Sequence, residues 1–115
     1  MIHILTCCKH GLVRSVGLAD VLKLHFKPVD VIPVGLSSNS ATTLEMLYQW
    51  ADWIIVMEER YGKRIPEGYG SKVLVCEVGQ DIYGSSHHGS LIDQCWRWCR
   101  KNNQILGIEE HYDAI

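Results

Sequence analysis

Ile2-His-Ile-Leu-Thr-Cys-Cys-Lys-His-Gly-Leu-Val-Arg-Ser15 opens the chain with the pattern of a strand, a short loop and the start of a helix. Residues 2–6 form an apolar run rich in Ile and Leu, which is typical of a buried strand. From about Arg14 to Phe26, apolar side chains recur at helical spacing, and Pro28 ends this predicted helix. The first 28 residues therefore predict a strand followed directly by a helix.

The same alternation continues along the rest of the chain. Further strands are predicted at residues 29–34, 53–57 and 72–78, and helices from a Thr42/Glu45 capping box, over residues 58–65 and from a Ser90/Asp93 capping box. Right-handed crossovers between such strands make the sheet parallel. The predicted fold is an α/β three-layer sandwich in which helices flank a four-stranded parallel sheet, as one domain over residues 1–115.

The loop after the first strand carries the residues with the clearest chemistry. Parallel sheets bind ligands at the carboxyl ends of their strands, often beside the first strand. The segment Cys8-Lys-His-Gly-Leu-Val-Arg14, called the Cys8 loop below, lies at this position and precedes a helix. Backbone N–H groups of Lys9, His10, Gly11, Leu12 and Val13 can converge on an anion there. The start of the helix adds positive potential.

This spacing of residue types is that of a nucleophile beside a phosphate-binding loop. Gly11 can adopt positive φ, which a tight loop needs, and Arg14 can donate two parallel hydrogen bonds to phosphate oxygens. The positive field favours the thiolate of Cys8, which is the nucleophilic form. Ser15 can donate a hydroxyl hydrogen bond to the sulfur. The alternative is that Cys8 is an inert residue at a strand end and that Arg14 is a solvated first-turn residue.

A phosphatase also needs an acid that protonates the leaving oxygen and then activates water. Asp81 follows the fourth predicted strand, whose carboxyl end should lie at the same edge as Cys8. We therefore predict Asp81 as the general acid, although an Asp between glycines is also an ordinary turn residue. Glu77 is a poorer candidate because it falls inside the strand pattern. His87 and His88 fit either a substrate contact or plain surface.

Composition and charge exclude several other classes of function. A formal net charge of -2 leaves no basic surplus for binding nucleic acid. No apolar run approaches the roughly 20 residues that span a membrane, and the amino-terminal residues do not resemble a signal peptide. Five cysteines, an odd number, favour a reducing compartment, so we expect a cytoplasmic protein. Their spacing fits no zinc site, and we expect no metal or other cofactor.

Three stretches of the sequence resemble the low-molecular-weight protein tyrosine phosphatase superfamily, most closely its short bacterial and phage branch. They are Ile4-Leu-Thr-Cys-Cys-Lys-His-Gly-Leu-Val-Arg-Ser15, Trp50-Ala-Asp-Trp-Ile-Ile-Val-Met-Glu-Glu-Arg60 and Asp81-Ile-Tyr-Gly84. The resemblance implies that Cys8 is the nucleophile, Arg14 the phosphate clamp, Ser15 the partner of the thiolate and Asp81 the general acid. It also implies that Tyr83 forms a wall of the substrate cleft.

The sequence departs from that family at several positions. Gly11 stands where Asn is common, Ile82 replaces a Pro in the acid loop, and Val13 occupies the place of a second cysteine. The implied activity is hydrolysis of a phosphorylated protein or a small aryl phosphate. Alternatives are a non-catalytic module that binds phosphate or a phosphoprotein, and arsenate reduction. Arsenate reduction would need further reactive cysteines, whereas Cys95 and Cys99 are expected in a helix core. The physiological substrate and the oligomeric state are not determined by the sequence.

Overall fold

A four-stranded parallel sheet forms the centre of the computed structural model, which describes residues 1–80 and 82–111. Its strand order is β3-β1-β4-β5. The strands are β1 (Ile2–Cys8), β3 (Val29–Gly35), β4 (Trp53–Val56) and β5 (Val73–Val75). The predicted parallel sheet is confirmed. The two central strands, β1 and β4, consist mainly of buried apolar residues, as expected for strands that are covered on both faces.

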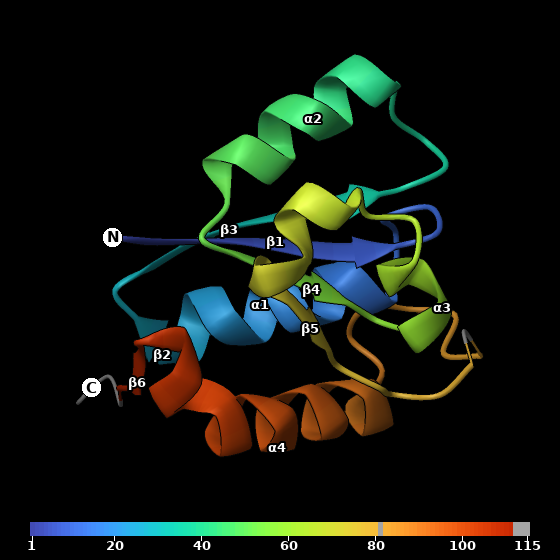
Figure 1. The fold of residues 1–115 in the computed structure, drawn as a ribbon. Helices are drawn as coiled ribbons and strands as arrows, with labels where there is room; N and C mark the ends of the chain where they lie inside the picture. Colours follow the sequence, from blue (N-terminus) through green and yellow to red (C-terminus); the bar gives the residue numbers. More distant parts are fainter. Residues whose placement is uncertain (81, 112–115) are drawn as a thin grey trace.

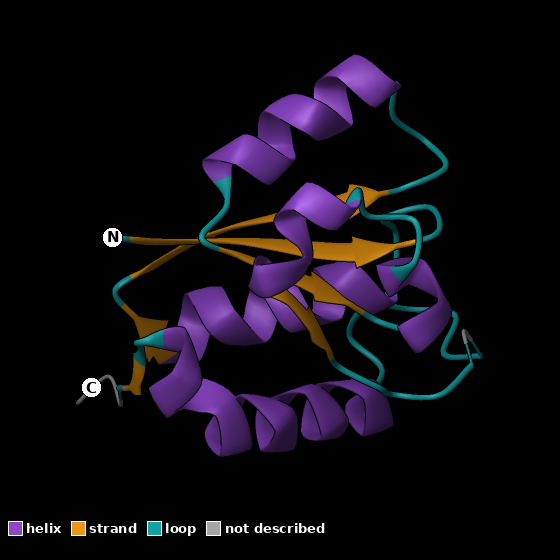
Figure 2. Ribbon diagram, viewed as in Figure 1, coloured by secondary structure: helices purple, strands orange, loops and turns teal. Residues whose placement is uncertain are grey.

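Helices cover both faces of this sheet and complete the predicted three layers (Figure 1). Helices α1 (Arg14–His25) and α4 (Gly89–Leu106) lie together on one face, and α2 (Ala41–Trp50) lies on the other. The colouring by secondary structure in Figure 2 shows the sheet edge-on between these two layers. Within the described residues, no helix is long and apolar enough to cross a membrane.

The carboxyl ends of β1, β4 and β5 all point to the same edge of the sheet, on the right in Figure 1. The one-turn helix α3 (Glu59–Gly62) follows β4 at this edge, and a 3-10 helix (Glu67–Lys72) then leads into β5. Loops that follow parallel strands meet here because every crossover returns the chain to the opposite edge. The fold therefore brings the Cys8 loop, the residues after β4 and the residues after β5 together.

Several predicted boundaries were wrong, and each error has a local cause. Helix α2 begins at Ala41 because the hydroxyl of Ser40, and not that of Thr42, accepts a hydrogen bond from the backbone N–H of Thr43. The strand predicted over residues 72–78 ends at Val75. β5 is an edge strand, and the carbonyl of Val75 accepts a hydrogen bond from the indole N–H of Trp98.

The helix predicted over residues 58–65 is reduced to the four residues of α3. The Ser90/Asp93 capping box is also wrong: α4 begins at Gly89, and the Nδ1 atom of His88 accepts a hydrogen bond from the N–H of Ser90.

A second, two-stranded antiparallel sheet was not predicted. It pairs β2 (Phe26–Lys27) with β6 (Glu109–Glu110) at the end of the molecule opposite the Cys8 loop (Figure 1). Helix α1 therefore ends at His25, one residue earlier than expected. The side chain of Glu110 also accepts hydrogen bonds from Trp96 and Arg100 of α4. This small sheet ties the ends of α1 and α4 together.

Candidate active site

The Cys8 loop connects the carboxyl end of β1 to the first turn of α1. Two backbone hydrogen bonds of 2.9 Å join it to the residues that follow β3: the N–H of Leu36 donates to the carbonyl of Cys8, and the N–H of Ser37 donates to that of Lys9. Gly11 has φ of +73°, so the predicted positive φ is confirmed. These contacts fix the path of the loop against the end of β3.

Gly35 makes this close approach possible. A Cβ atom at residue 35 would lie 2.3 Å from the carbonyl carbon of His10, and a Cβ at Gly11 would lie 2.5 Å from the backbone nitrogen of Gly35. Neither contact is compatible with a side chain. The two glycines therefore allow two backbone segments to touch, and the Cys8 loop depends on both of them.

Two groups lie within hydrogen-bond distance of the sulfur atom of Cys8. The backbone N–H of Gly11 donates to Sγ across 3.1 Å, and the Ser15 hydroxyl, which can donate or accept, lies 3.1 Å from Sγ. The backbone carbonyl of Ser15 accepts a hydrogen bond from Thr6, which holds the first turn of α1 against β1. A thiolate at Cys8 would receive both hydrogen bonds together with the positive field at the amino-terminal end of a twelve-residue helix.

The adjacent residue Cys7 is in a different environment. Side chains alternate along a strand, so Cys7 faces the layer of α2, where its charge would act on Tyr48. Its side chain is fully buried, and this burial raises the pKa of the Cys7 thiol well above its ordinary value, with a further contribution from Cys8. Cys7 is a packing residue, in agreement with the sequence prediction.

Arg14 is buried and holds three segments together. Its Nη1 atom donates to Oε1 of Glu58 and to the carbonyl oxygen of Gly79, each across 2.9 Å, and its Nη2 atom lies 3.4 Å from the hydroxyl of Tyr61. Burial alone would lower the pKa of Arg14, but the hydrogen bonds to Glu58 and Tyr61 outweigh it and raise the pKa. The Nε atom of Arg14 is buried and has no hydrogen-bond partner among the described residues.

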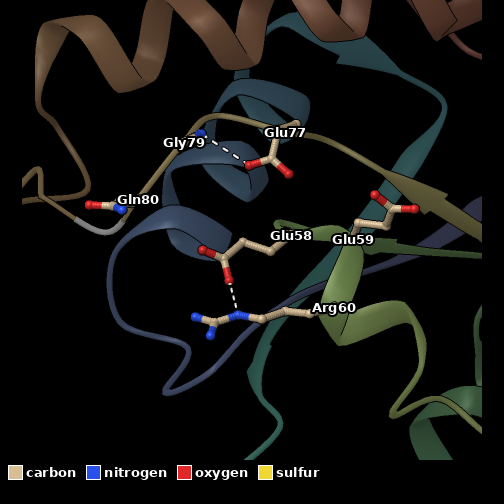
Figure 3. Close-up of a pocket in the computed structure, with 6 residues that line it drawn as sticks. All are labelled: Glu58, Glu59, Arg60, Glu77, Gly79 and Gln80. Carbon is tan, nitrogen blue, oxygen red and sulfur yellow. Dashed lines mark hydrogen bonds and ion pairs between the residues drawn. The ribbon is translucent and has the colours of Figure 1, made fainter.

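Glu58 is a site residue that the sequence did not single out. Its carboxylate, 15% exposed, lies between Arg14 and the exposed Arg60, and Figure 3 shows it pointing toward the Arg60 side chain. Burial would raise the pKa of Glu58, but hydrogen bonds from the two arginines reverse the effect and lower it. A usable signal existed, since Glu58 directly follows the end of the third predicted strand and must lie at the same edge as Cys8.

A cleft of about 500 Å³ opens at this edge of the sheet. Residues from the Cys8 loop, from the turn after β4 and from the loop after β5 line it: Lys9, His10, Arg14, Glu58, Arg60, Tyr61 and Gln80. Four of these seven are Lys, Arg or His, and one is acidic. The cleft can therefore accept an anion and offers an aromatic ring, that of Tyr61, beside it.

Only some of the predicted site residues line this cleft. Lys9 and His10 line it, Gly11 donates to the sulfur, Leu12 is 73% exposed, and Val13 packs against the core. Asp81 lies outside the described residues. Its neighbour Gln80 does line the cleft.

Tyr83 does not line the cleft. Its side chain is buried, its hydroxyl donates to the carbonyl of Val78 and accepts from the amide of Gln94, and its ring lies edge-on to His88. Among the described residues that line the cleft, the aromatic side chain is that of Tyr61, which was not predicted as a site residue.

The remaining cysteines of the described residues bear on two other functions, metal binding and arsenate reduction. Among the residues that the structure describes, no group of His, Cys, Asp and Glu side chains is placed to hold a metal ion. Cys76, Cys95 and Cys99 are fully buried, the latter two on the inner face of α4 as expected. A hydrogen bond with Cys95, followed by burial, raises the pKa of Cys76, and burial raises that of Cys99. The burial of all three cysteines, and the raised pKa values of Cys76 and Cys99, do not suit the resolving role that arsenate reduction would require.

Comparison with known proteins identifies the class of fold. No family model and no curated protein matches this sequence. Solved structures do match: the YwlE arginine phosphatase from Geobacillus stearothermophilus superposes with a TM-score of 0.65 at 16% identity, covering 91% of this chain and 95% of that one. The tyrosine phosphatase Wzb from Escherichia coli K30, in complex with sulphate, superposes with a TM-score of 0.57 at 17% identity, covering 88% and 99%.

A mutant of YwlE from Bacillus subtilis gives a TM-score of 0.63 at 16% identity, over 90% of this chain and 99% of that one. The resemblance expected from the sequence is thus confirmed at the level of the fold: the chain has the fold of the low-molecular-weight phosphatases. At these identities the likeness concerns the fold, and the activity must be argued from the site itself.

Proposed function

We propose that this chain is a cysteine-dependent phosphomonoester hydrolase that acts on phosphorylated protein, with phosphotyrosine as the preferred residue. The observation that carries the proposal is the environment of Arg14. Its Nε–H is buried without an acceptor among residues 1–80 and 82–111, in a side chain that lines the cleft and belongs to the same loop as Cys8. An oxygen of a bound phosphate would be the missing acceptor, because buried donors are rarely left unpaired.

The first chemical step is attack on phosphorus by the thiolate of Cys8. The Sγ–P bond forms while the bond from phosphorus to the leaving oxygen breaks, and Asp81 donates its proton to that oxygen. Arg14 and the backbone N–H groups of the Cys8 loop stabilise the charge on the non-bridging oxygens. The products are a phosphocysteine and the free alcohol, which for a tyrosine substrate is the phenol.

The second step returns the enzyme to its starting state. Water attacks phosphorus, the carboxylate of Asp81 takes its proton, and the Sγ–P bond breaks to release phosphate and the Cys8 thiolate. The Ser15 hydroxyl, 3.1 Å from Sγ, would stabilise the departing thiolate by hydrogen bonding. No metal is required, because Arg14 and the loop amides supply the positive charge.

Two features of the cleft bear on the choice of substrate. Among the similar structures, YwlE is described as an arginine phosphatase and Wzb as a tyrosine phosphatase. The ring of Tyr61 at the cleft and the exposed Leu12 in the Cys8 loop favour an aryl leaving group in this chain. Five free cysteines agree with a reducing compartment, and we propose the cytoplasm.

Hydrolysis of p-nitrophenyl phosphate between pH 5 and 7 in the presence of EDTA tests the proposal. The wild-type protein should turn over, the Cys8→Ser variant should show no turnover, and Asp81→Asn should lose about 10²–10⁴-fold in kcat. A folded, reduced wild-type protein without turnover would rule out the hydrolase. If the wild-type protein shows no turnover but binds a phosphopeptide, and Asp81→Asn leaves that binding unchanged, the fold serves as a phosphate-binding module and not as an enzyme.

A further inference from the structure

A second hollow of about 250 Å³ lies beside the cleft and is lined by Lys9, Arg60, Tyr61 and Arg64. We call it the basic pocket. Lys9, Arg60 and Tyr61 also line the cleft, so the two spaces share a wall, whereas Arg64 lines the basic pocket alone. Three of the four lining side chains are permanent cations at neutral pH, and none is acidic.

A third hollow, which also has Arg60 in its lining, has the reverse character. This acidic pocket, of about 310 Å³, is lined by Glu58, Glu59, Arg60, Glu77, Gly79 and Gln80, and Figure 3 shows the carboxylate of Glu58 turned toward Arg60 and that of Glu77 toward the backbone nitrogen of Gly79. The whole chain carries a net charge of only -2. The cations of the basic pocket are therefore a local concentration and do not reflect a generally basic surface.

The cations of the basic pocket are only partly engaged by other groups. Arg60 pairs with Glu58 through its Nε atom, and its Nη2 atom lies 3.4 Å from the hydroxyl of Tyr61, a neutral group. Arg64 donates from Nη1 to the hydroxyl of Ser37, a neutral acceptor, across 3.1 Å. The ammonium group of Lys9 makes no hydrogen bond or ion pair to any described residue. Among the described residues, Lys9 and Arg64 thus have no carboxylate partner, whereas Arg60 has one in Glu58.

We propose that the basic pocket binds an anionic group that lies next to the phosphorylated residue of the substrate. The substrate class is then a phosphorylated protein segment with an acidic side chain beside the phosphotyrosine. This inference rests on the proposed function. The cleft and the basic pocket share Lys9, Arg60 and Tyr61, and neighbouring residues of an extended chain are separated by only about 3.3–3.6 Å along it. A phosphotyrosine in the cleft would therefore place the side chain of an adjacent residue within reach of the basic pocket.

Binding of fluorescent phosphotyrosine peptides to the Cys8→Ser protein tests this inference without requiring turnover. Two peptides differ only in Glu or Gln at the residues beside the phosphotyrosine, and their Kd values are measured by anisotropy at about 50 and 300 mM salt. We expect the Glu peptide to bind about five- to tenfold more tightly at the lower salt concentration, with a smaller ratio at the higher one.

Variants of Arg64, made in the Cys8→Ser protein, locate the effect. Arg64→Gln should reduce the ratio between the two peptides to below twofold, Arg64→Lys should restore most of it, and the exposed neighbour Lys63→Gln, which lines neither space, should leave it unchanged. A third peptide with phosphoserine in place of Glu shows whether a carboxylate or a second phosphate is the better ligand for the pocket.

Equal Kd values for the Glu and Gln peptides, or a ratio that Arg64→Gln does not alter, would overturn the inference. That failure is separate from failure of the proposed function, which the p-nitrophenyl phosphate assay measures with a substrate that has no second anion. A protein that hydrolyses p-nitrophenyl phosphate but does not distinguish the peptides would be a phosphatase without this pocket preference.

Discussion

The Cys8 loop and the loop of residues 76–88 after β5 meet at one edge of the sheet but are held in different ways. Backbone hydrogen bonds and direct glycine contacts bind the Cys8 loop to the residues after β3. Beyond Cys76, the described part of the second loop makes only local backbone hydrogen bonds and is fixed by side chains, through Tyr83 and through the contact of Gly79 with Arg14. Backbone contacts thus hold the Cys8 loop in place, whereas the described part of the second loop depends on a few side-chain contacts.

Two glycines at similar φ offer the sharpest test of this difference. Gly11 has φ of +73° and Gly84 has φ of +69°. A side chain at either position would have to adopt the left-handed conformation, which costs about 1–2 kcal/mol. A Cβ atom at residue 84 would have no neighbouring atom within 4 Å, whereas a Cβ atom at residue 11 would clash with the backbone of Gly35. We expect Gly11→Ala to lower the free energy of unfolding by roughly 3–5 kcal/mol and to abolish turnover. Gly84→Ala should cost only about 1–2 kcal/mol.

Urea denaturation and p-nitrophenyl phosphate hydrolysis of both variants check this expectation. Equal losses of stability would mean that the contact between Gly11 and Gly35 does not hold the Cys8 loop, and the contrast between the two loops would disappear.

Glu58 tests the link between the two loops, because Arg14 contacts both Glu58 and Gly79. Glu58→Gln keeps the shape of the side chain but removes its charge, and we expect a loss of roughly 1–3 kcal/mol at pH 7. The pKa of Glu58 is lowered in the folded protein, so its stabilisation is complete above the unfolded value near 4.3 and is lost as the pH falls through the folded value. The difference between wild type and variant should therefore shrink below about pH 4.

Denaturation at pH 7, 4 and 3 measures this convergence. A difference that stayed constant over that range would show that the charge of Glu58 contributes nothing and that packing alone explains the loss.

The smallest expected effect concerns the side-chain anchoring of the second loop. Tyr83→Phe removes the hydroxyl that joins the Val78 carbonyl to Gln94, and we expect a loss of about 1 kcal/mol in the free energy of unfolding. The KM for p-nitrophenyl phosphate should change little, because Tyr83 does not line the cleft. A variant as stable as wild type would indicate that other contacts fix this loop.

The parts of the site predicted from sequence are those that depend on neighbours in the chain. The strand–loop–helix pattern, the positive φ of Gly11 and the approach of Ser15 to Cys8 all arise within one segment. Glu58 and Tyr61 were missed because their roles come from contacts with Arg14, more than 40 residues away in sequence.

The errors in the fold have a similar origin. The two residues each of β2 and β6 are too few to show a periodicity, so their pairing could not be expected from the pattern of the sequence. The early end of β5 depends on its position at the sheet edge and on Trp98, both of which are tertiary features. Tyr83 was assigned to the cleft by resemblance, and only the folded chain shows its hydroxyl turned toward Val78.

The opposite orientation of Cys7 and Cys8 has a consequence for damage by oxidants. Peroxide converts a thiolate to a sulfenic acid, which a second thiol can rescue by condensing to a disulfide. In this chain Val13 leaves the Cys8 loop without another cysteine, and Cys7 faces the other side of the strand. Recovery of Cys8 from a sulfenic acid would therefore depend on a thiol supplied from outside the chain, and without one the oxidation would continue to the irreversible sulfinic and sulfonic acids.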